Sequence, residues 1–390
     1  MKILFYCPDR HIRFDGRTPD RAGVGGGITA RLRIATALAR VGHDVTVFGN
    51  VGEPSVYRQV HFRPTDDRGT LGKQDSVADV LVIHSSGGAL DVGEAANLPI
   101  KSRVRVLLVS GVDCPKNAEF QHFDAVYAPS NFIAGIVRTR WPISSVPVFV
   151  ADYGVTPVPR FRRLVPIKRQ EKRMIYTSHP SKGLDTAIRL LRLLRAMDSY
   201  KTEPGYELHV FGGNALWGMA EVPPNPESGL FYHGIIGQEQ LATEYRRSGI
   251  AIHLQTREEP FGISLVESLA GGCVVVASPT GAFVELVTHR RSGYLIHGDP
   301  AEERTLQAAA DAIRLDRGEH ASMGRAAKQV PFSWQTLAKV WERHLLQLLG
   351  NADPAEAVGA CSDCGGRCFR YPDGSHCSVC GLYRRGKGGF

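Results

Sequence analysis

Two glutamates eight positions apart, Glu259 and Glu267, flank a Pro-Phe-Gly turn that leads into an apolar run. This spacing places Glu259 in a loop and Glu267 about two turns up a helix. Free N–H groups and the positive end of the dipole at the start of such a helix favour an anion such as a phosphate. Two acids beside an anion site are unfavourable unless the ligand also carries hydroxyl groups that need acceptors. A ligand that combines phosphate with sugar hydroxyls, such as a nucleotide sugar, meets both conditions.

The stretch 259–267, with the runs 268–277 and 281–287 that follow it, resembles the donor-site signature of retaining family 4 glycosyltransferases. These enzymes, also called glycosyl transferases group 1, have the GT-B fold. The order of the flanking features extends the resemblance over roughly residues 1–350. It implies a hexosyltransferase that uses a nucleoside-diphosphate sugar and retains the configuration at the anomeric carbon. A solvated helix start with incidental acidic residues is the alternative explanation of the stretch.

The resemblance implies a role for each residue of this turn. Glu267 would accept hydrogen bonds from the ribose hydroxyls of the nucleotide, and Glu259 would contact the donor sugar and orient it. The backbone N–H groups of Phe261, Gly262 and Ile263 would meet the sugar or the distal phosphate. Gly262 lets the chain come close because it has no Cβ. A purely structural turn is the alternative.

Lys182 lies between an expected strand and an expected helix, and it resembles the lysine that these enzymes place against the diphosphate. A fixed cation there would stabilise the negative charge that grows on the leaving phosphate by several kcal/mol. The family usually has an arginine a few residues earlier, where this chain has Thr177, Ser178 and His179. We expect either that a protonated His179 supplies part of the charge, with an ordinary pKa of ~6.5, or that Lys182 acts alone.

Two features of the first half add candidate site residues. The glycine-rich loop 23–27 precedes the first long helix, and the N–H groups of Gly26 and Gly27 are expected to approach the phosphates. His84 ends an apolar run, at a position expected to face the cleft and to act in catalysis. A turn without function and a structural histidine are the alternatives. Where the family often has a sugar-contacting histidine, this chain has the segment 110–113, in which Asp113 is the substitute.

Five of the eight cysteines are crowded into the last thirty residues. Twelve residues separate the pair Cys361 and Cys364 from the pair Cys377 and Cys380. Two such Cys-x2-Cys pairs suit tetrahedral Zn²⁺ held by four thiolates, and the metal would supply the folding energy of so small a module. Cys368 and His376 are spare candidate ligands. A redox-active dithiol is the alternative.

Basic residues are concentrated in two places. One is the segment 160–173, which has the composition of an exposed connector, with contact to an anionic membrane or an acceptor phosphate as the alternative. The other is the cysteine-rich module, where five Lys or Arg stand against two Asp between residues 361 and 390. Its charge and its aromatic side chains fit contact with nucleic acid or with a protein partner.

Apolar and β-branched runs predict two α/β domains. In the first half, strands are expected at 2–6, 45–48, 80–83, 104–109, 125–127 and 146–150, with a helix at 29–41. In the second half, strands are expected at 174–176, 207–212, 250–254 and 273–277, with a helix at 185–197. The expected fold class is therefore α/β of the GT-B type, with two Rossmann-like doubly wound domains facing a cleft and a small C-terminal zinc ribbon.

The domain boundaries follow from these elements. We expect an acceptor-side domain, a basic hinge, a nucleotide-sugar donor domain, a helix that crosses back to the first domain, a linker and a zinc-ribbon-like module. Their limits are 1–155, 156–173, 174–330, 331–350, 351–360 and 361–390.

Composition and charge narrow the class of protein. The chain has 390 residues, 43% hydrophobic and 22% charged, with a formal net charge of +8. No window approaches the ~18 apolar residues of a membrane span, and the N-terminus has no signal-peptide core. We therefore expect a cytoplasmic protein, with peripheral contact at the inner membrane surface as an option. The chain lacks an Asp-x-Asp motif, so no catalytic divalent metal is expected at the diphosphate.

These observations favour a retaining glycosyltransferase that moves a sugar from a nucleoside-diphosphate sugar to a glycan, a lipid or a small molecule. The alternative from another class is a non-catalytic protein that keeps this fold and binds nucleic acid or a protein. A third possibility is a sugar-nucleotide epimerase or a phosphorylase, but the chain lacks the additional catalytic histidines or cofactor lysine expected there.

Overall fold

The computed structural model describes most of the chain. The described residues are 1–65, 77–84, 97–117, 119–143, 145–156, 167–198, 205–222, 225–315, 317–328, 332–351, 357–371, 374–378 and 381–385. They form two compact units. Unit 1 comprises Met1–Arg17, Gly26–Gly154 and Phe332–Phe390, and unit 2 comprises Thr18–Gly25 and Val155–Pro331. Within the described part, no helix has both the length and the apolar character that crossing a bilayer requires.

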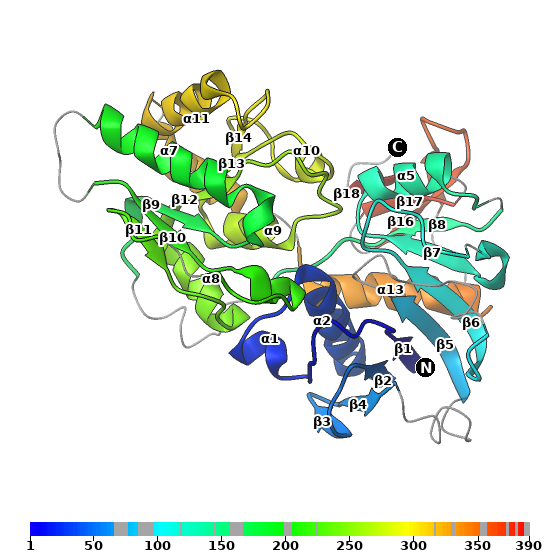
Figure 1. Cartoon of the computed structure of the whole chain (residues 1–390). Coiled ribbons are helices and arrows are strands. Elements are labelled where there is room, and N and C mark those ends of the chain that lie inside the picture. Colours follow the sequence, from blue (N-terminus) through cyan, green and yellow to red (C-terminus); the bar gives the residue numbers. More distant parts are fainter. Residues whose placement is uncertain are drawn as a thin grey trace. The chain divides into compact units, whose positions relative to one another are not determined.

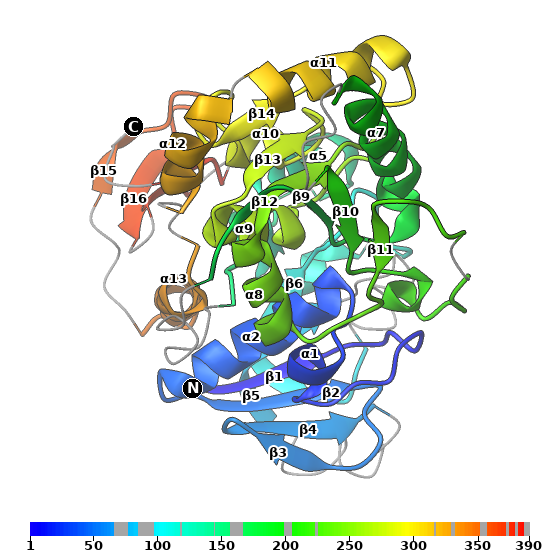
Figure 2. The same cartoon turned by 90° about the vertical axis from the view of Figure 1, so that its left-hand side faces the viewer.

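Unit 1 is built on an eight-stranded sheet with the order β3-β4-β2-β1-β5-β6-β7-β8 (Figure 1). The strands are β1 (Lys2–Tyr6), β2 (Asp44–Gly49), β3 (Ser55–Tyr57), β4 (Val60–Pro64), β5 (Val77–His84), β6 (Lys101–Leu108), β7 (Ala125–Ala128) and β8 (Val148–Val150). All neighbours are parallel except β3 and β4, which form an antiparallel pair at one edge (Figure 2). The strand order reverses between β1 and β5, as in a doubly wound sheet.

Among the described residues of unit 1, the helices are α2 (Gly26–Arg40), α5 (Asn131–Arg140) and α13 (Trp334–Leu348), and a 3₁₀ turn η2 covers Phe120–His122. Helix α13 packs against α2 and places the buried Trp341 beside the sheet. The Trp341 ring stacks on Phe5 at 6.2 Å and meets Tyr127 edge-on at 4.7 Å. Aromatic pairs of this kind add to the stability that burial provides. Helix α13 lies within the segment 331–350, where the sequence predicted a helix.

Unit 2 contains a six-stranded parallel sheet with the order β11-β10-β9-β12-β13-β14. Its strands are β9 (Gln170–Tyr176), β10 (Glu207–Val210), β11 (Leu230–Tyr232), β12 (Ser248–His253), β13 (Val274–Ala277) and β14 (Gly293–Leu295). The strand order reverses between β9 and β12, which is the arrangement of a dinucleotide-binding fold. Ligands of such sheets bind outside the carboxyl ends of the strands at this point.

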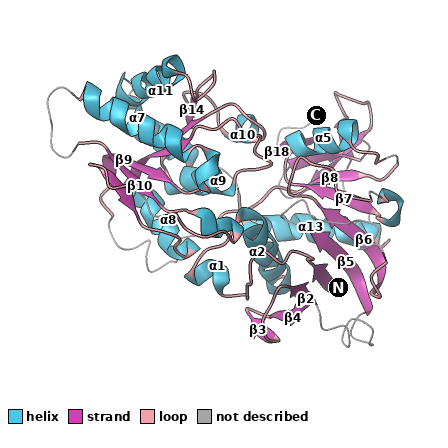
Figure 3. Ribbon diagram, viewed as in Figure 1, coloured by secondary structure: helices cyan, strands magenta, loops and turns pink. Residues whose placement is uncertain are grey.

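Helices cover the sheet of unit 2 (Figure 3). They are α1 (Thr18–Arg21), α7 (Leu184–Met197), α8 (Gln238–Arg247), α9 (Ile263–Gly271), α10 (Phe283–Leu286), α11 (Glu303–Leu315) and α12 (Arg317–Ala327), with 3₁₀ turns η3 (Pro180–Lys182) and η4 (Asn214–Trp217). Leucines of α7 share one core with apolar residues of α11 and of the strands. Helices α8 and α9 contact each other and β12.

The C-terminal residues form a four-stranded antiparallel sheet that belongs to unit 1. Its strands are β15 (Ala357–Ala360), β16 (Arg367–Tyr371), β17 (Gly374–Cys377) and β18 (Tyr383–Arg385). Arg385 donates two hydrogen bonds to the Asp152 carboxylate, at 2.6 and 2.7 Å. The Asn131 side chain bonds both the N–H and the carbonyl of Tyr383, at 2.9 and 3.1 Å. Polar contacts therefore hold this sheet to α5 and to the residues after β8.

Aromatic packing strengthens the same attachment. The His376 ring stacks on Phe149 at 4.5 Å and on Tyr383 at 4.3 Å. Tyr371 meets Phe149 edge-on and donates to the Gln347 side chain at 2.7 Å. Tyr371, His376 and Tyr383 are thus used in packing within unit 1, whereas the sequence suggested that the aromatic residues of the module serve contact with nucleic acid or a protein partner.

Two other expectations about organisation need correction. Lys172 and Arg173, assigned to an exposed connector, lie in β9, and Arg173 is buried in an ion pair with Glu244 at 2.8 Å. The last four residues of β9 are all buried, so the strand enters the core although the segment before it is basic. The linker expected at 351–360 ends in β15. Arg160, Arg162 and Arg163 lie outside the described residues.

Candidate functional site

The candidate site of unit 2 lies where three loops follow neighbouring strands. These loops are the segments 177–183 after β9, 211–217 after β10 and 254–262 after β12. Gly183 joins η3 to α7 with φ of 95°, and a Cβ there would collide with the Leu254 carbonyl. Close backbone approach therefore brings the first and third loops together at the point where the strand order reverses.

The Pro-Phe-Gly turn does lead into a helix, as expected. Gly262 is the N-cap of α9 with φ of 97°, and no side chain caps the helix. A Cβ on Gly262 would lie 2.5 Å from the Phe283 ring. Phe261 is buried in the core, whereas Ile263 is half-buried at the start of the helix. The helix therefore begins at Ile263 with uncapped N–H groups, the arrangement that favours an anion.

Lys182 and Glu259 form an ion pair within this site. Lys182 Nζ lies 2.7 Å from Glu259 Oε2, with side-chain exposures of 20% and 12%. The Gln255 amide also donates to Glu259 Oε2, at 3.2 Å. Because the pair is largely withdrawn from water, its charges interact more strongly than surface charges do. Two predicted site residues are thus in direct contact, which the sequence did not reveal.

Glu267 lies one turn into α9, nearer the helix start than the two turns expected. Its Oε1 accepts a hydrogen bond from the Gln238 amide at 3.0 Å. The Gln238 side-chain oxygen in turn accepts from the Thr156 hydroxyl at 2.7 Å. A chain of hydrogen bonds from Thr156 through Gln238 thus holds the Glu267 carboxylate in one orientation.

The surroundings of His179 disfavour its protonated form, so they favour the option in which Lys182 acts without it. Its Nδ1 accepts a hydrogen bond from the Ser181 N–H at 3.2 Å, so the ring carries its proton on Nε2. Burial, then the charges of Lys182 and Arg257, lower the pKa of His179. The ring stacks on Trp217 at 3.6 Å with an interplanar angle of 10°. We conclude that His179 is a neutral support for Trp217.

His84 of unit 1 is the last residue of β5. It is fully buried, Arg31 Nε donates to its Nδ1 at 3.0 Å, and its Nε2 lies 2.5 Å from Ser110 Oγ. Since Nδ1 accepts, Nε2 is the donor to Ser110, which in turn lies 3.1 Å from the Tyr153 hydroxyl. Burial and the nearby Arg31 hold the pKa of His84 well below its ordinary value. Both ring nitrogens have protein partners, which favours the structural alternative, and a catalytic role of His84 stays a prediction.

The other candidate site residues of unit 1 are Gly26, Gly27 and Asp113. Gly26 and Gly27 are the first two residues of α2, not part of the preceding loop. Their N–H groups still lie at a helix start, as the anion-binding prediction requires. Asp113 is exposed in the loop after β6. The roles of all three in ligand binding stay predictions.

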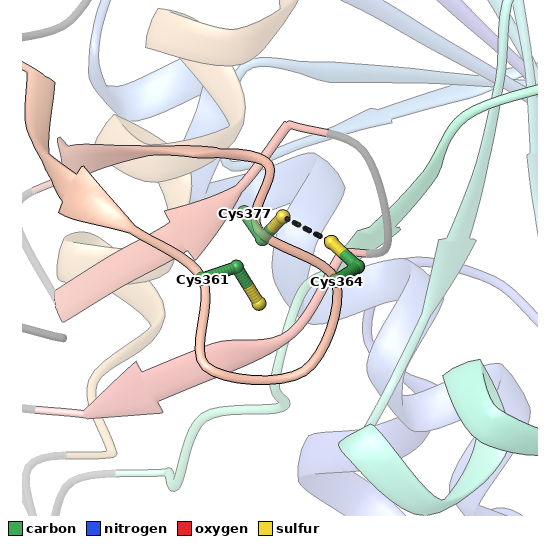
Figure 4. Close-up of side chains that lie close together, drawn as sticks. All are labelled: Cys361, Cys364 and Cys377. Carbon is green, nitrogen blue, oxygen red and sulfur yellow. Dashed lines mark hydrogen bonds between the residues drawn. The ribbon is translucent and has the colours of Figure 1, made fainter.

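Three of the four predicted zinc ligands converge in the C-terminal sheet (Figure 4). The sulfur atoms of Cys361, Cys364 and Cys377 lie within 4.8 Å of one another, and the last two are 3.5 Å apart. Cys380 lies outside the described residues. Burial, followed by Cys377 and Cys361, raises the pKa of the Cys368 thiol to about 12. Three converging sulfurs fit a thiolate metal site, and they can also fit reduced thiols without a metal.

The donor-side segment has relatives among known proteins. Residues 166–330 match the family model described as Glycosyl transferases group 1. This segment is a group 1 glycosyltransferase domain. The D-inositol 3-phosphate glycosyltransferase of Streptomyces avermitilis is 36% identical over 107 residues, which cover 26% of this chain and 22% of that protein. The phosphatidyl-myo-inositol mannosyltransferase of Propionibacterium freudenreichii is 31% identical over 147 residues, which cover 36% and 35%. The chain thus matches about a fifth to a third of the length of these relatives.

Solved structures resemble the chain over most of its length. A sucrose-phosphate synthase of Thermosynechococcus elongatus has a TM-score of 0.65 at 17% identity and covers 90% of this chain and 100% of its own. Anabaena HepE in complex with UDP and glucose has a TM-score of 0.60 at 17% identity, with coverages of 89% and 100%. These likenesses establish the GT-B fold, with two Rossmann-like domains, that the sequence predicted.

Several residues of the group 1 glycosyltransferase domain escaped the sequence analysis. They are Trp217, Gln238, Gln255 and Arg257. Gln238 opens α8 and Gln255 follows β12, so a polar side chain just beyond a buried strand or at a helix start was an available signal. Trp217 and Arg257 lie in irregular loops, where spacing says nothing about contacts.

Proposed function

We propose that the chain is a retaining glycosyltransferase that takes its sugar from a nucleoside-diphosphate sugar. The observation that carries the proposal is the Lys182–Glu259 ion pair beside the uncapped start of α9, at the reversal point of the unit 2 sheet. A cation, a sugar-orienting carboxylate and helix N–H groups are the three functions that a bound diphosphate sugar needs.

Each group has a defined part in the proposed reaction. Lys182 stabilises the charge on the departing diphosphate, and Glu259 accepts hydrogen bonds from sugar hydroxyls. Glu267, held by Gln238, accepts from the ribose hydroxyls. The bond between the anomeric carbon and the diphosphate oxygen breaks, a bond to the acceptor oxygen forms on the same face, and the acceptor proton passes to the leaving diphosphate. No side-chain nucleophile and no divalent metal at the diphosphate are part of this scheme.

The donor and acceptor are proposed at the level of chemical class. Anabaena HepE, whose fold is similar, binds UDP and glucose, so uridine diphosphate sugars are the first donors to test. Several matched relatives are named for phosphorylated inositol compounds, so polyol phosphates are the first acceptors to test. Glycans and lipids remain in the acceptor screen.

We also propose a structural zinc ion in the C-terminal sheet. Cys361, Cys364 and Cys377 supply three converging sulfurs, and the Cys-x2-Cys spacing makes Cys380 the fourth ligand. Zinc there would tie the loop after β15 to the end of β17. A redox-active dithiol between Cys364 and Cys377 is the competing use of the same atoms.

A non-catalytic binding protein of the same fold is the competing function. Its support is the missing diphosphate arginine and the basic C-terminal module, of which Arg385 pairs with Asp152 while Arg367, Arg370 and Arg384 are exposed. A sugar-nucleotide epimerase would bind the same donor but would release an epimerised nucleotide sugar. Product analysis separates the two enzymes.

The experiment that tests the proposal is thermal unfolding with UDP-, GDP- and ADP-sugars, without divalent cation, for the natural protein and Glu267→Ala. A ligand at 100 times its Kd stabilises the folded protein by about 2.7 kcal/mol. We expect stabilisation by one nucleotide class, lost in the variant. An absence of any shift with all three classes contradicts the transferase proposal.

A further inference from the structure

Arg257 occupies the loop that also carries Glu259, and it has no role in the scheme above. Its guanidinium lies over the Trp217 ring, 5.1 Å from the centroid. The Trp217 ring in turn stacks on His179. Residues from the loops after β9, β10 and β12 are thus linked through one indole ring. A cation held over an aromatic face is positioned at little entropic cost.

The charge balance of the site singles Arg257 out. Lys182 is paired with Glu259 at 2.7 Å, and His179 is neutral for the reasons given above. Arg257 is exposed, and the described part of the chain offers its guanidinium no carboxylate partner. The Lys182 N–H donates to the His179 carbonyl at 2.9 Å, and Arg257 lies over the Trp217 ring that stacks on His179, so both cations border the same histidine–indole pair. Of the cations Lys182 and Arg257, Arg257 is therefore the one without a carboxylate partner among the described residues.

We propose that Arg257 is the second cation of the diphosphate site, and that it contacts phosphate oxygens directly. This inference rests on the proposed use of a nucleoside-diphosphate sugar. A guanidinium offers a planar fork of donors that matches two phosphate oxygens at once. The Trp217 ring positions the Arg257 guanidinium that lies over it, and the stacked His179 ring positions Trp217. The positive charge missing from the segment 177–179 is in this way supplied from the loop after β12.

UDP binding measured by titration calorimetry at low and at high salt tests the proposal. We expect Arg257→Gln to weaken UDP binding on the order of tenfold at low salt, because it removes a charge-assisted contact. The loss should shrink at ~1 M salt, where screening acts within about 3 Å. Arg257→Lys should recover part of the affinity. Glu258→Gln, at the exposed neighbouring position, is the matched control and should not weaken binding.

Three results would overturn the proposal. Unchanged UDP affinity in Arg257→Gln shows that the guanidinium does not meet the diphosphate. An equal loss at low and high salt, not recovered by Arg257→Lys, shows that Arg257 only supports Trp217 or the nucleobase. Failure of the natural protein to bind UDP, GDP or ADP contradicts the proposed function itself, so the two failures are distinguishable. Unfolding temperatures without ligand, equal across the variants, exclude a folding defect.

Discussion

At the scale of single residues, the contact between Lys182 and Glu259 decides how the site would behave before and after ligand binding. In the ligand-free chain each charge balances the other at 2.7 Å. A diphosphate offers Lys182 a second anion, and sugar hydroxyls offer Glu259 new donors. The pair therefore keeps both groups extended in the site without leaving either charge buried alone.

Lys182→Ala should lose donor turnover while keeping nucleoside binding. Removing a cation that stabilises charge in the transition state costs on the order of 100-fold to 1,000-fold in rate. The rate of UDP-sugar hydrolysis without acceptor, measured together with uridine affinity, checks this. Lys182→Arg is the control that keeps the charge. Equal turnover in Lys182→Ala would remove this residue from the mechanism.

Gly262→Ala should reduce stability and nucleotide binding together. The substitution places a Cβ 2.5 Å from the Phe283 ring, in a backbone conformation with φ of 97° that alanine rarely adopts. Such strain costs about 1–3 kcal/mol. Urea unfolding gives the free energy of unfolding directly. Gly111→Ala is the matched control, because a Cβ there meets no atom within 4 Å.

At the scale of elements, buried histidines join strands and helices to their neighbours in the neutral form. Burial lowers the pKa of His253 in β12 and of His344 in α13 to about 3. His344 Nδ1 and the Tyr127 hydroxyl form a hydrogen bond of 2.6 Å, which links α13 to β7. Protonation of such a ring would place an unpaired charge in the core.

Stability should therefore fall as the pH drops below about 6.5. The unfolded chain takes up protons at the ordinary histidine pKa of ~6.5, whereas the folded rings stay neutral to about pH 3. Each such histidine then lowers the free energy of unfolding by about 1.4 kcal/mol per pH unit within this range, and adds nothing above it. Urea unfolding at pH 8, 7, 6 and 5 measures the slope. His253→Asn should reduce the slope, and the exposed His297→Gln should leave it unchanged.

The elements themselves were largely predictable, because buried parallel strands are apolar on both faces. The first strand matches at 2–6, and β5, β7, β9, β12 and β13 were found within a few residues of their ends. The strands β3, β4, β11 and β14 were missed, since they are short and only partly apolar or exposed, so their sequences do not stand out from loops. Packing against partners distant in sequence, not local pattern, makes them strands.

The site was predictable only where a loop runs into a helix. Lys182, Glu259 and Gly262 were nominated because the turn between a strand and a helix start resembles a donor-site signature, and their roles stay predictions. The hydrogen bonds of His179 and His84 were not predictable, since they depend on neighbours such as Ser181 and Arg31 that only the folded chain brings near. Sequence spacing does not contain such contacts.

At the scale of the whole molecule, the C-terminal sheet is part of unit 1 and not an appended module. Arg385 pairs with Asp152, whose side chain is 9% exposed, and the Arg385 guanidinium also lies over the Phe332 ring at 4.9 Å. Tyr371, His376 and Tyr383 pack on the same unit. We therefore expect that unfolding of the C-terminal sheet lowers the stability of unit 1.

Removing bound metal should lower the unfolding temperature of unit 1. A structural zinc site contributes its binding free energy to folding, so chelation withdraws it. Metal content by mass spectrometry and calorimetric unfolding, before and after a chelator, check this. Cys361→Ser should reproduce the effect, whereas Cys114→Ser, at an exposed cysteine outside the cluster, should not. A natural protein that contains no zinc and is indifferent to chelator would favour the dithiol.

Arg385→Ala should destabilise unit 1 by about 3 kcal/mol. The substitution leaves the Asp152 carboxylate, 9% exposed, without its bidentate partner, and removing one partner of a buried pair costs about 3–5 kcal/mol. Partial exposure of Arg385 places the expectation at the lower end. Calorimetric unfolding measures the change. Arg385→Ala with Asp152→Asn should recover part of the loss, because no charge is then left behind.

Unit 1 is built from segments that are far apart in the sequence, so the ribosome synthesises them at different times. Residues 155–331 of unit 2 lie between the two long segments of unit 1. At roughly 5–20 residues per second, their translation takes about 10 to 35 s, during which the nascent N-terminal half lacks α13 and its Trp341. Unit 2 can finish folding on the ribosome, while unit 1 waits for the last residues to emerge. The apolar flank of α2 that Trp341 and its neighbours later cover is then a natural target for a chaperone.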